Sequence, residues 1–373
     1  MHIAHLIDML PTAGAQKLLV TFAHQARRNG DAVTVISLRE KTRFHSTIPT
    51  ELEEAGARVL YFPVKRLADP VRFFQLAWFL RRGQYDVLHT HLVSSNIFGG
   101  MAGRLIGLPV IVTLHSTGRD PRYAHYMRDQ LEMWVLRHVN RVIAVGDSVK
   151  EAYSPLLRRQ LDVIPNAVNE PIMLSPEQRI ALRAQLTGEA LRPILIGVGS
   201  LSPDKCFGDL LVAFSKIRTK VPGVALLIAG DGVEREHLFS QCQQLGLEGD
   251  VFWLGVRGDV PRLMVASDIY VSSSAREGLA IAMLEAMMVG LPMVVTSVGE
   301  APRVAADDRG VLVPPQNPDA LASALLQLLQ DSERQQVLGM HARNYALQTY
   351  SADKWYGRLT DLYLEELQKG KQN

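Results

Sequence analysis

Short apolar runs that alternate with stretches of helical character constrain the fold of this 373-residue chain more than any other feature. Most runs are continuously apolar, which is the pattern of parallel strands covered on both faces. Alternation of strand and helix predicts right-handed crossovers, and its presence in both halves predicts two doubly wound parallel α/β sheets. The expected strands lie at 2–7, 33–38, 58–62, 87–89, 110–114, 142–145 and 162–164 in the first half, and at 194–198, 225–229, 251–254, 269–271, 293–296 and 310–313 in the second.

Chain length also favours two domains. The boundary is expected between Pro-Asn-Ala-Val at 165–168 and Arg-Pro at 192–193, with 1–168 assigned to one Rossmann-like domain and 169–350 to the other. A charged helix is expected soon after the boundary, with Ser175 as its N-cap and Gln178 as the third residue of a capping box.

Bulk composition is that of a globular protein, with 47% hydrophobic and 21% charged residues. The net charge of +2 argues against a dedicated nucleic-acid binder. Residues 1–170 carry 21 basic and 15 acidic side chains and hold nine of the eleven histidines. A mildly basic first half suggests an anionic surface or substrate, although a bias of this size is often only solvation.

Two cysteines are too few for a disulfide framework or a metal cluster and fit a reduced cytoplasm. No signal peptide is expected, because the chain opens directly on an apparent strand. Residues 278–295 are apolar enough for a membrane span, but Glu285 and the Gly-Leu-Pro of 290–292 divide them into a helix and a strand. The expected location is cytoplasmic, soluble or peripheral at a membrane.

Glu277 and Glu285 bracket an apolar segment between the expected strands 269–271 and 293–296. Glu277 and Gly278 are expected at the entrance of a helix, and Glu285 inside it. Eight helical residues come to about 80° beyond two turns, so a ligand at the entrance could contact backbone N–H groups and still reach Glu285. Such an entrance favours phosphate. A capping acid and an ordinary surface glutamate would give the same spacing, and this alternative stays open.

Polar or glycine-rich residues follow most of the expected strands. Ligands of open parallel sheets bind beyond the carboxyl ends of the strands, so these segments predict a ligand cleft between the two domains. They lie at 8–17, 89–91, 115–116, 199–205, 230–232, 255–256 and 273–278. His89 and His91 suggest a metal pair, but without a further ligand set they are interpreted as core or cleft-wall residues.

Five motifs, in their order along the chain, resemble those of the retaining GT-B glycosyltransferases of family 4, also called glycosyl transferases group 1. The resemblance covers essentially the whole chain and is strongest from 198 to 315. The motifs are T-x-H at 113–115, a P-N-G-V-like 165–168, G-x-L-x-x-x-K at 199–205, G-D-G at 230–232 and E-x7-E from Glu277 to Glu285. It implies a first domain that binds the acceptor, a second that binds the donor, and a closing helix at 351–369 that packs back on the first.

The resemblance also implies roles for single residues toward a nucleotide-diphosphate sugar donor. Glu285 would accept hydrogen bonds from the ribose, and Lys205 would neutralise the departing diphosphate. Gly14 would allow close approach to the diphosphate, and His115 would lie at the reacting face. Without the pattern, a turn glycine, a solvated lysine and a structural histidine explain the same residues. The implied catalytic residues are Glu277, His115 and Lys205, and the implied donor-binding residues are Gly14, Ser200, Lys205, Gly230, Asp231, Gly278, Leu279, Ala280 and Glu285.

The reaction implied is hexosyl or N-acetylhexosaminyl transfer with retention, most often from a UDP-sugar, to a glycan or lipid-linked saccharide in bacterial polysaccharide or glycolipid synthesis. The usual proposal for this family is attack on the front face, in which the departing phosphate takes the acceptor's proton. No metal and no cofactor besides the donor are implied.

Two helical stretches of the first half, 70–82 and 119–141, combine aromatic and basic residues. Such helices can lie on anionic membranes, and many relatives act on lipid-linked acceptors. The favoured alternative is that the aromatic stripe packs on the sheet while the arginines face water.

Departures from the family pattern leave other hypotheses open. Ser200 replaces the usual arginine and removes a cation near the diphosphate, for which Lys17 or Arg276 could compensate. This change favours a catalytically silent, nucleotide-sugar-binding partner subunit as the alternative to an enzyme. A nicotinamide dehydrogenase is disfavoured because no strand is followed by G-x-G-x-x-G.

Overall fold

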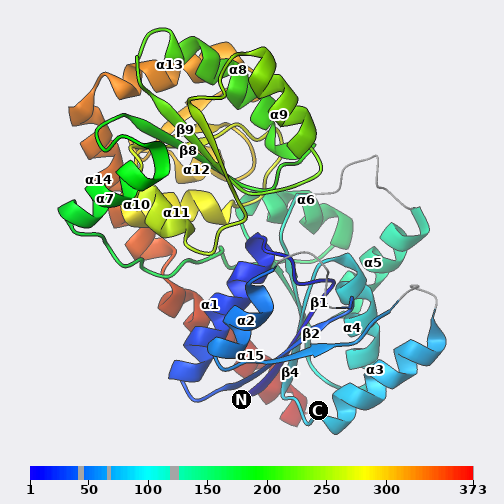
Figure 1. Cartoon of the computed structure of the whole chain (residues 1–373). Coiled ribbons are helices and arrows are strands. Elements are labelled where there is room, and N and C mark those ends of the chain that lie inside the picture. The colour runs from blue at the N-terminus through cyan, green and yellow to red at the C-terminus, as the bar shows by residue number, and fades with distance from the viewer. Residues whose placement is uncertain (41–45, 65–68, 118–125, 373) are drawn as a thin grey trace. The chain divides into compact units, whose positions relative to one another are not determined.

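A computed structural model of the chain describes residues 1–40, 46–64, 69–117 and 126–372. The chain divides into two compact units, one formed by Met1–Ala167 with Ala352–Asn373 and the other by Val168–Ser351 (Figure 1). The division lies one residue from the boundaries expected at 168 and 350.

The first unit contains a seven-stranded parallel sheet in the order β3-β2-β1-β4-β5-β6-β7. All seven strands fall where the apolar runs predict them. β4 is two residues longer than expected, so His91 lies inside the strand rather than after it. The strands are β1 His2–Ile7, β2 Ala32–Ser37, β3 Arg58–Tyr61, β4 Val87–His91, β5 Val110–Leu114, β6 Arg141–Ala144 and β7 Asp162–Val163.

Helices cover both faces of this sheet, as continuously apolar strands require. The last helix of the chain returns to this unit, where Tyr356 and Tyr363 enter a core built on β1, β2 and α1. The helices are α1 Gly14–Arg28, α2 Ile48–Glu54, α3 Pro70–Arg82, α4 Val93–Ile106, α5 Tyr126–His138, α6 Asp147–Leu157 and α15 Ala352–Gln372.

The second unit contains a six-stranded parallel sheet in the order β10-β9-β8-β11-β12-β13. The strands are β8 Ile194–Val198, β9 Ala225–Ala229, β10 Val251–Gly255, β11 Ile269–Ser272, β12 Met293–Thr296 and β13 Val311–Val313. The helices are α7 Pro176–Thr187, α8 Phe207–Arg218, α9 Arg235–Gln244, α10 Val260–Ala266, α11 Ile281–Val289, α12 Ala301–Val304, α13 Pro318–Leu329 and α14 Ser332–Thr349, with a 3₁₀ turn at Pro203–Lys205.

The prediction of two doubly wound parallel sheets is therefore confirmed. The capping box of α7 is also confirmed, because Ser175 Oγ accepts from Gln178 N and the Gln178 side chain accepts from Ser175 N. Residues 278–295 separate into α11 and β12 as expected. Among the described residues, every helix is too short or too polar to cross a bilayer.

Each sheet has a point where the strand order reverses, between β1 and β4 in the first unit and between β8 and β11 in the second. In doubly wound folds the loops that leave the two central strands at such a point border the ligand site. The loops after β8 and β11 are those that contain Lys205 and Glu277.

Candidate active site

The loops after β8 and β11 are tied together by hydrogen bonds in the second unit. Ser273 Oγ donates to the Lys205 carbonyl at 2.9 Å, and Ala275 N donates to the Asp204 carbonyl at 2.8 Å. Arg276 and Asp204 form an ion pair between the same loops. These contacts hold two loops from distant parts of the sequence in one arrangement.

Lys205 and Glu277 form an ion pair through Nζ and Oε2, and each side chain is 22% exposed. Ser274 Oγ lies 3.5 Å from the same carboxylate oxygen. The resemblance assigned the lysine to the diphosphate and named both residues as catalytic, without predicting a contact between them. In the structure the ammonium and the carboxylate form an ion pair with one another.

Glu285 lies on the second turn of α11, and its charge and that of Glu277 both act on a residue that the sequence analysis did not select. Tyr270, on β11, is buried, and its pKa is raised by that burial and further by the charges of Glu277 and Glu285. Its hydroxyl is hydrogen bonded to Ser272. The sequence signal that could have pointed to Tyr270 is a tyrosine in an otherwise apolar strand directly before the site.

The helix entrance lies farther along the chain than predicted. α11 begins at Ile281, and Ala280 is its N-cap, so Glu277 and Gly278 precede the helix. The prediction was wrong because Gly278 is held in a turn by the next loop, where Glu300 N donates to its carbonyl at 3.0 Å. Ala280 provides no side-chain cap for the first-turn N–H groups. Such a terminus suits an anion, since the helix dipole and the amide donors act together.

Gly230 in the G-D-G motif has a packing role. Its φ is +148°, and a Cβ at this position would lie 1.8 Å from the Gly199 carbonyl oxygen. Gly199 N donates to Ala229 O and Leu201 N to Asp231 O, each at 3.0 Å. The glycine therefore lets the loop that leads to Lys205 lie against the loop after β9.

Asp231 and Ser200 are exposed. The Asp231 carboxylate accepts from Gly232 N at 2.8 Å and pairs with Arg235 at 3.2 Å, and Ser200 Oγ lies 3.3 Å from Ser202 Oγ. The two cations considered as substitutes for the missing arginine are both in ion pairs, Arg276 with Asp204 and Lys17 with Glu51.

In the first unit, Gly14 and His115 lie at the carboxyl edge of the sheet. Gly14 is the first residue of α1, which follows the loop after β1. His115 directly follows β5. Asp8, also after β1, accepts from the backbone N of Ser95 at 2.7 Å and thereby caps α4, the helix after β4. The loops at this switch point are joined as they are in the second unit.

His115 belongs to a group of histidines that the sequence analysis did not bring together. His115 Nε2 lies 3.1 Å from His91 Nδ1, and His91 Nε2 lies 3.0 Å from His5 Nδ1. His5 joins the group because β1 pairs with β4, which places it opposite His89. His89 and His91, which were interpreted as core or cleft-wall residues, are both buried.

His89 has separate partners. Its Nε2 lies 2.7 Å from Thr113 Oγ1 and its Nδ1 lies 2.5 Å from the hydroxyl of Tyr363 on α15. Burial lowers the pKa of His5 to about 3 and that of His115 to about 4, and it holds the pKa values of His89 and His91 well below the usual range. The four rings are therefore neutral at physiological pH.

Two family descriptions match the chain in adjacent segments. "Glycosyltransferase Family 4" matches residues 12–170 and "Glycosyl transferases group 1" matches residues 178–345. The first segment covers the first unit except residues 1–11, which include β1, and α15, and the second covers the second unit except a few residues at each end.

Individual proteins agree with the family match. The chain is 27% identical over 381 residues to N-acetyl-alpha-D-glucosaminyl L-malate synthase of Bacillus anthracis, covering 98% of this chain and 97% of that protein. It is 26% identical to the UDP-Gal:alpha-D-GlcNAc-diphosphoundecaprenol alpha-1,3-galactosyltransferase of Escherichia coli, covering 85% of this chain and 86% of the relative. Anabaena HepE, solved with UDP-glucose, has the same fold, with a TM-score of 0.86 at 22% identity over 98% of this chain and 100% of HepE. The chain belongs to the group 1, family 4 glycosyltransferases of the GT-B fold.

Proposed function

We propose that this glycosyltransferase moves a hexosyl or N-acetylhexosaminyl unit from a UDP-sugar to a glycan or lipid-linked saccharide, with retention of anomeric configuration and without a metal ion. The observation that carries the proposal is the Lys205–Glu277 pair, held by two tied loops at the switch point of the second sheet. Bacterial polysaccharide or glycolipid synthesis is the proposed setting, because relatives of this chain include the galactosyltransferase named above, which acts on a diphosphoundecaprenol-linked sugar.

In the proposed complex, Lys205 gives up its ion pair with Glu277 and pairs with the donor's diphosphate instead. The ammonium is already placed, so it needs only a small movement to meet a dianionic ligand. A preorganised cation beside the leaving group stabilises the charge that develops there in the transition state. Gly278, Leu279 and Ala280 lead into α11, and their backbone N–H groups would hold the sugar and diphosphate. Glu285 would accept from the ribose hydroxyls.

The bond that breaks joins the anomeric carbon to the diphosphate oxygen. The acceptor hydroxyl attacks from the same face and its proton passes to that departing oxygen, so configuration is retained without a covalent intermediate. Glu277, released from Lys205, would lie against the sugar and stabilise its developing positive charge. His115 would hydrogen bond the sugar or the acceptor.

A ligand panel tests the donor assignment. UDP, GDP, ADP, NAD and NADP are each added at millimolar concentration without metal, and thermal unfolding is followed. A ligand at 100 times its Kd adds about 2.7 kcal/mol, so a clear shift is expected with UDP alone. Glu285→Gln should abolish the shift, whereas Glu236→Gln, an exposed glutamate on α9, should retain it. A shift with NAD, or none with any nucleotide, would contradict the proposal.

A catalytically silent, nucleotide-sugar-binding subunit is the second candidate, favoured by exposed Ser200 where the family has arginine. The two candidates separate in a transfer assay with UDP-sugars. UDP binding without hydrolysis or transfer of any donor sugar would select the silent subunit.

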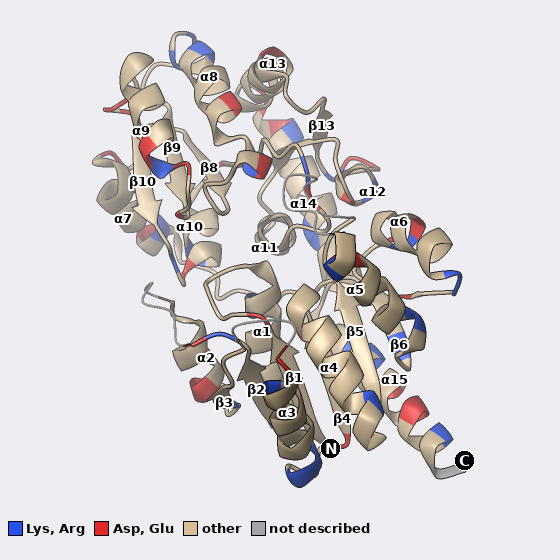
Figure 2. Ribbon diagram, turned by 90° about the vertical axis from the view of Figure 1, so that its right-hand side faces the viewer, with Lys and Arg blue, Asp and Glu red and all other residues tan. Residues whose placement is uncertain are grey.

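The exposed face of α3 supports a further proposal, that the first unit contacts the cytoplasmic face of an anionic membrane. Val71, Phe74 and Trp78 lie on one side of the helix and are 65%, 61% and 61% exposed. The expectation that the aromatic stripe packs on the sheet was therefore wrong for two of its four aromatic residues, because Leu76, Ala77 and Leu80 form the buried side instead. Figure 2 shows basic residues along the same helix. Arg119, Arg122 and Tyr123 of the second basic stretch lie outside the described residues.

Replacing Phe74 and Trp78 together with serine is expected to reduce flotation of the protein with phosphatidylglycerol-containing vesicles by at least about tenfold, because two aromatic anchors are lost. Both side chains are largely exposed, so the fold should persist. Ile172 and Leu191 are also exposed, and their serine variants form the matched control. Equal flotation of the Phe74/Trp78 variant and the control would contradict the membrane proposal.

A further inference from the structure

His115, His91 and His5 form a continuous row from the edge of the first sheet into its core. The ring centroids of His115 and His91 are 5.4 Å apart, and those of His91 and His5 are 5.3 Å apart. The corresponding nitrogens are separated by 3.1 and 3.0 Å. Because the centroid separation exceeds the nitrogen separation by about one ring width, the rings meet edge to edge, with planes inclined by 35° and 20°. Both contacts are N–H···N hydrogen bonds in the range expected for a nitrogen donor.

Proton counting couples the three rings. A neutral imidazole has one N–H donor and one acceptor nitrogen, so a ring that donates on one side must accept on the other. The row therefore has two arrangements. In one, every ring has its proton on Nε2 and His115 Nδ1 is an acceptor; in the other, every proton is on Nδ1 and His115 Nδ1 is a donor.

The buried end distinguishes the two arrangements. Within the described residues, His5 Nε2 has no hydrogen-bond partner and is fully buried. It adjoins a cavity of about 10 Å³ lined by Phe22, Trp355 and Leu359 among other residues, which is at the lower limit for one water molecule. Orphaned N–H groups are rarer in protein interiors than under-satisfied acceptors. His5 Nε2 is therefore the nitrogen that keeps its lone pair, and the proton of His5 is on Nδ1.

We infer that His5 and His91 are positioning residues that fix His115 in the Nδ1–H tautomer, so that it presents a hydrogen-bond donor to an oxygen of the donor sugar or the acceptor. The tautomer follows from the row alone, whereas its use in transfer rests on the proposed function. Nδ1 is the His115 nitrogen that does not face His91. A fixed donor at this position requires no reorganisation when the ligand binds.

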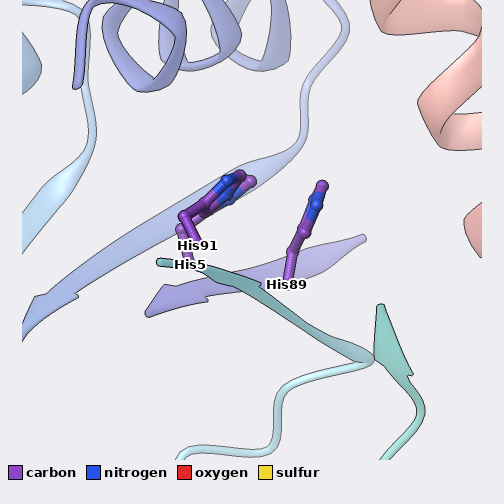
Figure 3. A group of neighbouring side chains, drawn as sticks. All are labelled: His5, His89 and His91. Carbon is purple, nitrogen blue, oxygen red and sulfur yellow. The ribbon is translucent and has the colours of Figure 1, made fainter. Parts of the chain in front are cut away.

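A metal site built from the same histidines is the competing arrangement. Nitrogens of His5, His89 and His91 lie within 4.8 Å of one another, and the three side chains project from adjacent strands (Figure 3). Zinc requires lone pairs that converge on one point. Here the facing nitrogens of His5 and His91 point at each other, and both nitrogens of His89 lie at hydrogen-bond distance from Thr113 and Tyr363. A metal ion would have to break these hydrogen bonds.

Nitrogen-15 NMR of histidine-labelled full-length protein tests the inference directly, because two-bond N–H couplings report each tautomer. The His115 signals are assigned by their loss in His115→Gln. We expect Nδ1–H for His5, His91 and His115 in the wild type. His91→Phe keeps a ring but removes both nitrogens, so His115 should revert to Nε2–H, the form that free histidine prefers in water.

Transfer kinetics give the second measurement. His91→Phe should lower kcat by about tenfold to a hundredfold, the order of effect expected for one misplaced donor. His91→Gln should restore kcat toward the wild-type value, since the glutamine amide can accept a hydrogen bond from His5 and donate one to His115. His24→Gln, an exposed histidine on α1, is the control and should leave both readouts unchanged.

The outcomes separate the inference from the proposed function. Nε2–H on His115 in the wild type, or no change of its tautomer in His91→Phe, overturns the inference. Stoichiometric Zn²⁺ binding that His5→Phe abolishes also overturns it, in favour of the metal site. The expected tautomers in a protein that transfers no sugar would leave the inference standing and reject the proposed function.

Discussion

Replacing Lys205 with alanine is expected to lower sugar transfer by about 10²- to 10³-fold, the loss typical of one preorganised charge at a transition state. The substitution removes the cation nearest to the proposed leaving group and frees Glu277 to repel the diphosphate. Binding of UDP should weaken as well. The measurement is kcat and KM for the donor, together with the Kd for UDP.

Lys216→Ala is the matched control, because this lysine also forms an ion pair in the second unit but lies at the surface on α8. Lys205→Arg should retain part of the activity, since it keeps the charge. A double-mutant cycle with Glu277→Ala separates the roles. If the pair is only structural, the double variant will recover the activity lost in the single variants, whereas a catalytic pair leaves it inactive. Transfer by Lys205→Ala within threefold of the wild type would reject the assigned role.

The free energy of unfolding of the first unit is expected to fall steeply as the pH drops from 6.5 toward 4. His5, His89, His91 and His115 have pKa values lowered by burial in the folded state. In the unfolded chain they bind protons below about pH 6.5, while the folded rings stay neutral until their own lowered pKa values are reached. Stability from these groups is therefore present above pH 6.5 and lost as the pH falls, by about 1.4 kcal/mol per pH unit for each histidine.

Urea unfolding at a series of pH values measures this slope. Tryptophan fluorescence reports the first unit selectively in a Trp253→Phe background, because the remaining tryptophans, at 78, 134 and 355, belong to that unit. His5→Phe removes one of the titrating rings and should flatten the slope by about one proton, whereas His24→Gln should leave it unchanged. A slope below one proton between pH 6.5 and 4 would contradict the assignment of the rings as neutral.

The strands were predictable because the information for a buried parallel strand is local. β1, β5, β8, β9 and β12 begin and end where their apolar runs do. The length of β4 was underestimated because histidine is a polar residue, and only the neighbours of His91 across the sheet make it a core residue. The start of α11 was misplaced because a hydrogen bond from Glu300, more than twenty residues from Gly278, holds the preceding turn.

The candidate site was predictable only in part, for the same reason. Glu277 and Lys205 were selected by motif, but their contact depends on β8 lying beside β11. Tyr270 and His5 carry no motif and acquire a role only through the charges and rings around them. The exposed side of α3 could not be assigned, since both sides of that helix contain aromatic residues.

The return of α15 to the first unit has a consequence for synthesis on the ribosome. Tyr363 hydrogen bonds to His89, and Arg141 pairs with Glu366 at 2.7 Å, so the first unit's core is completed by residues translated after the whole of the second unit. The second unit, Val168–Ser351, emerges entirely before them. Although its residues emerge second, the second unit is the first that can complete its fold during translation, and Phe22 and its neighbours in the first unit stay uncovered until α15 has left the ribosome.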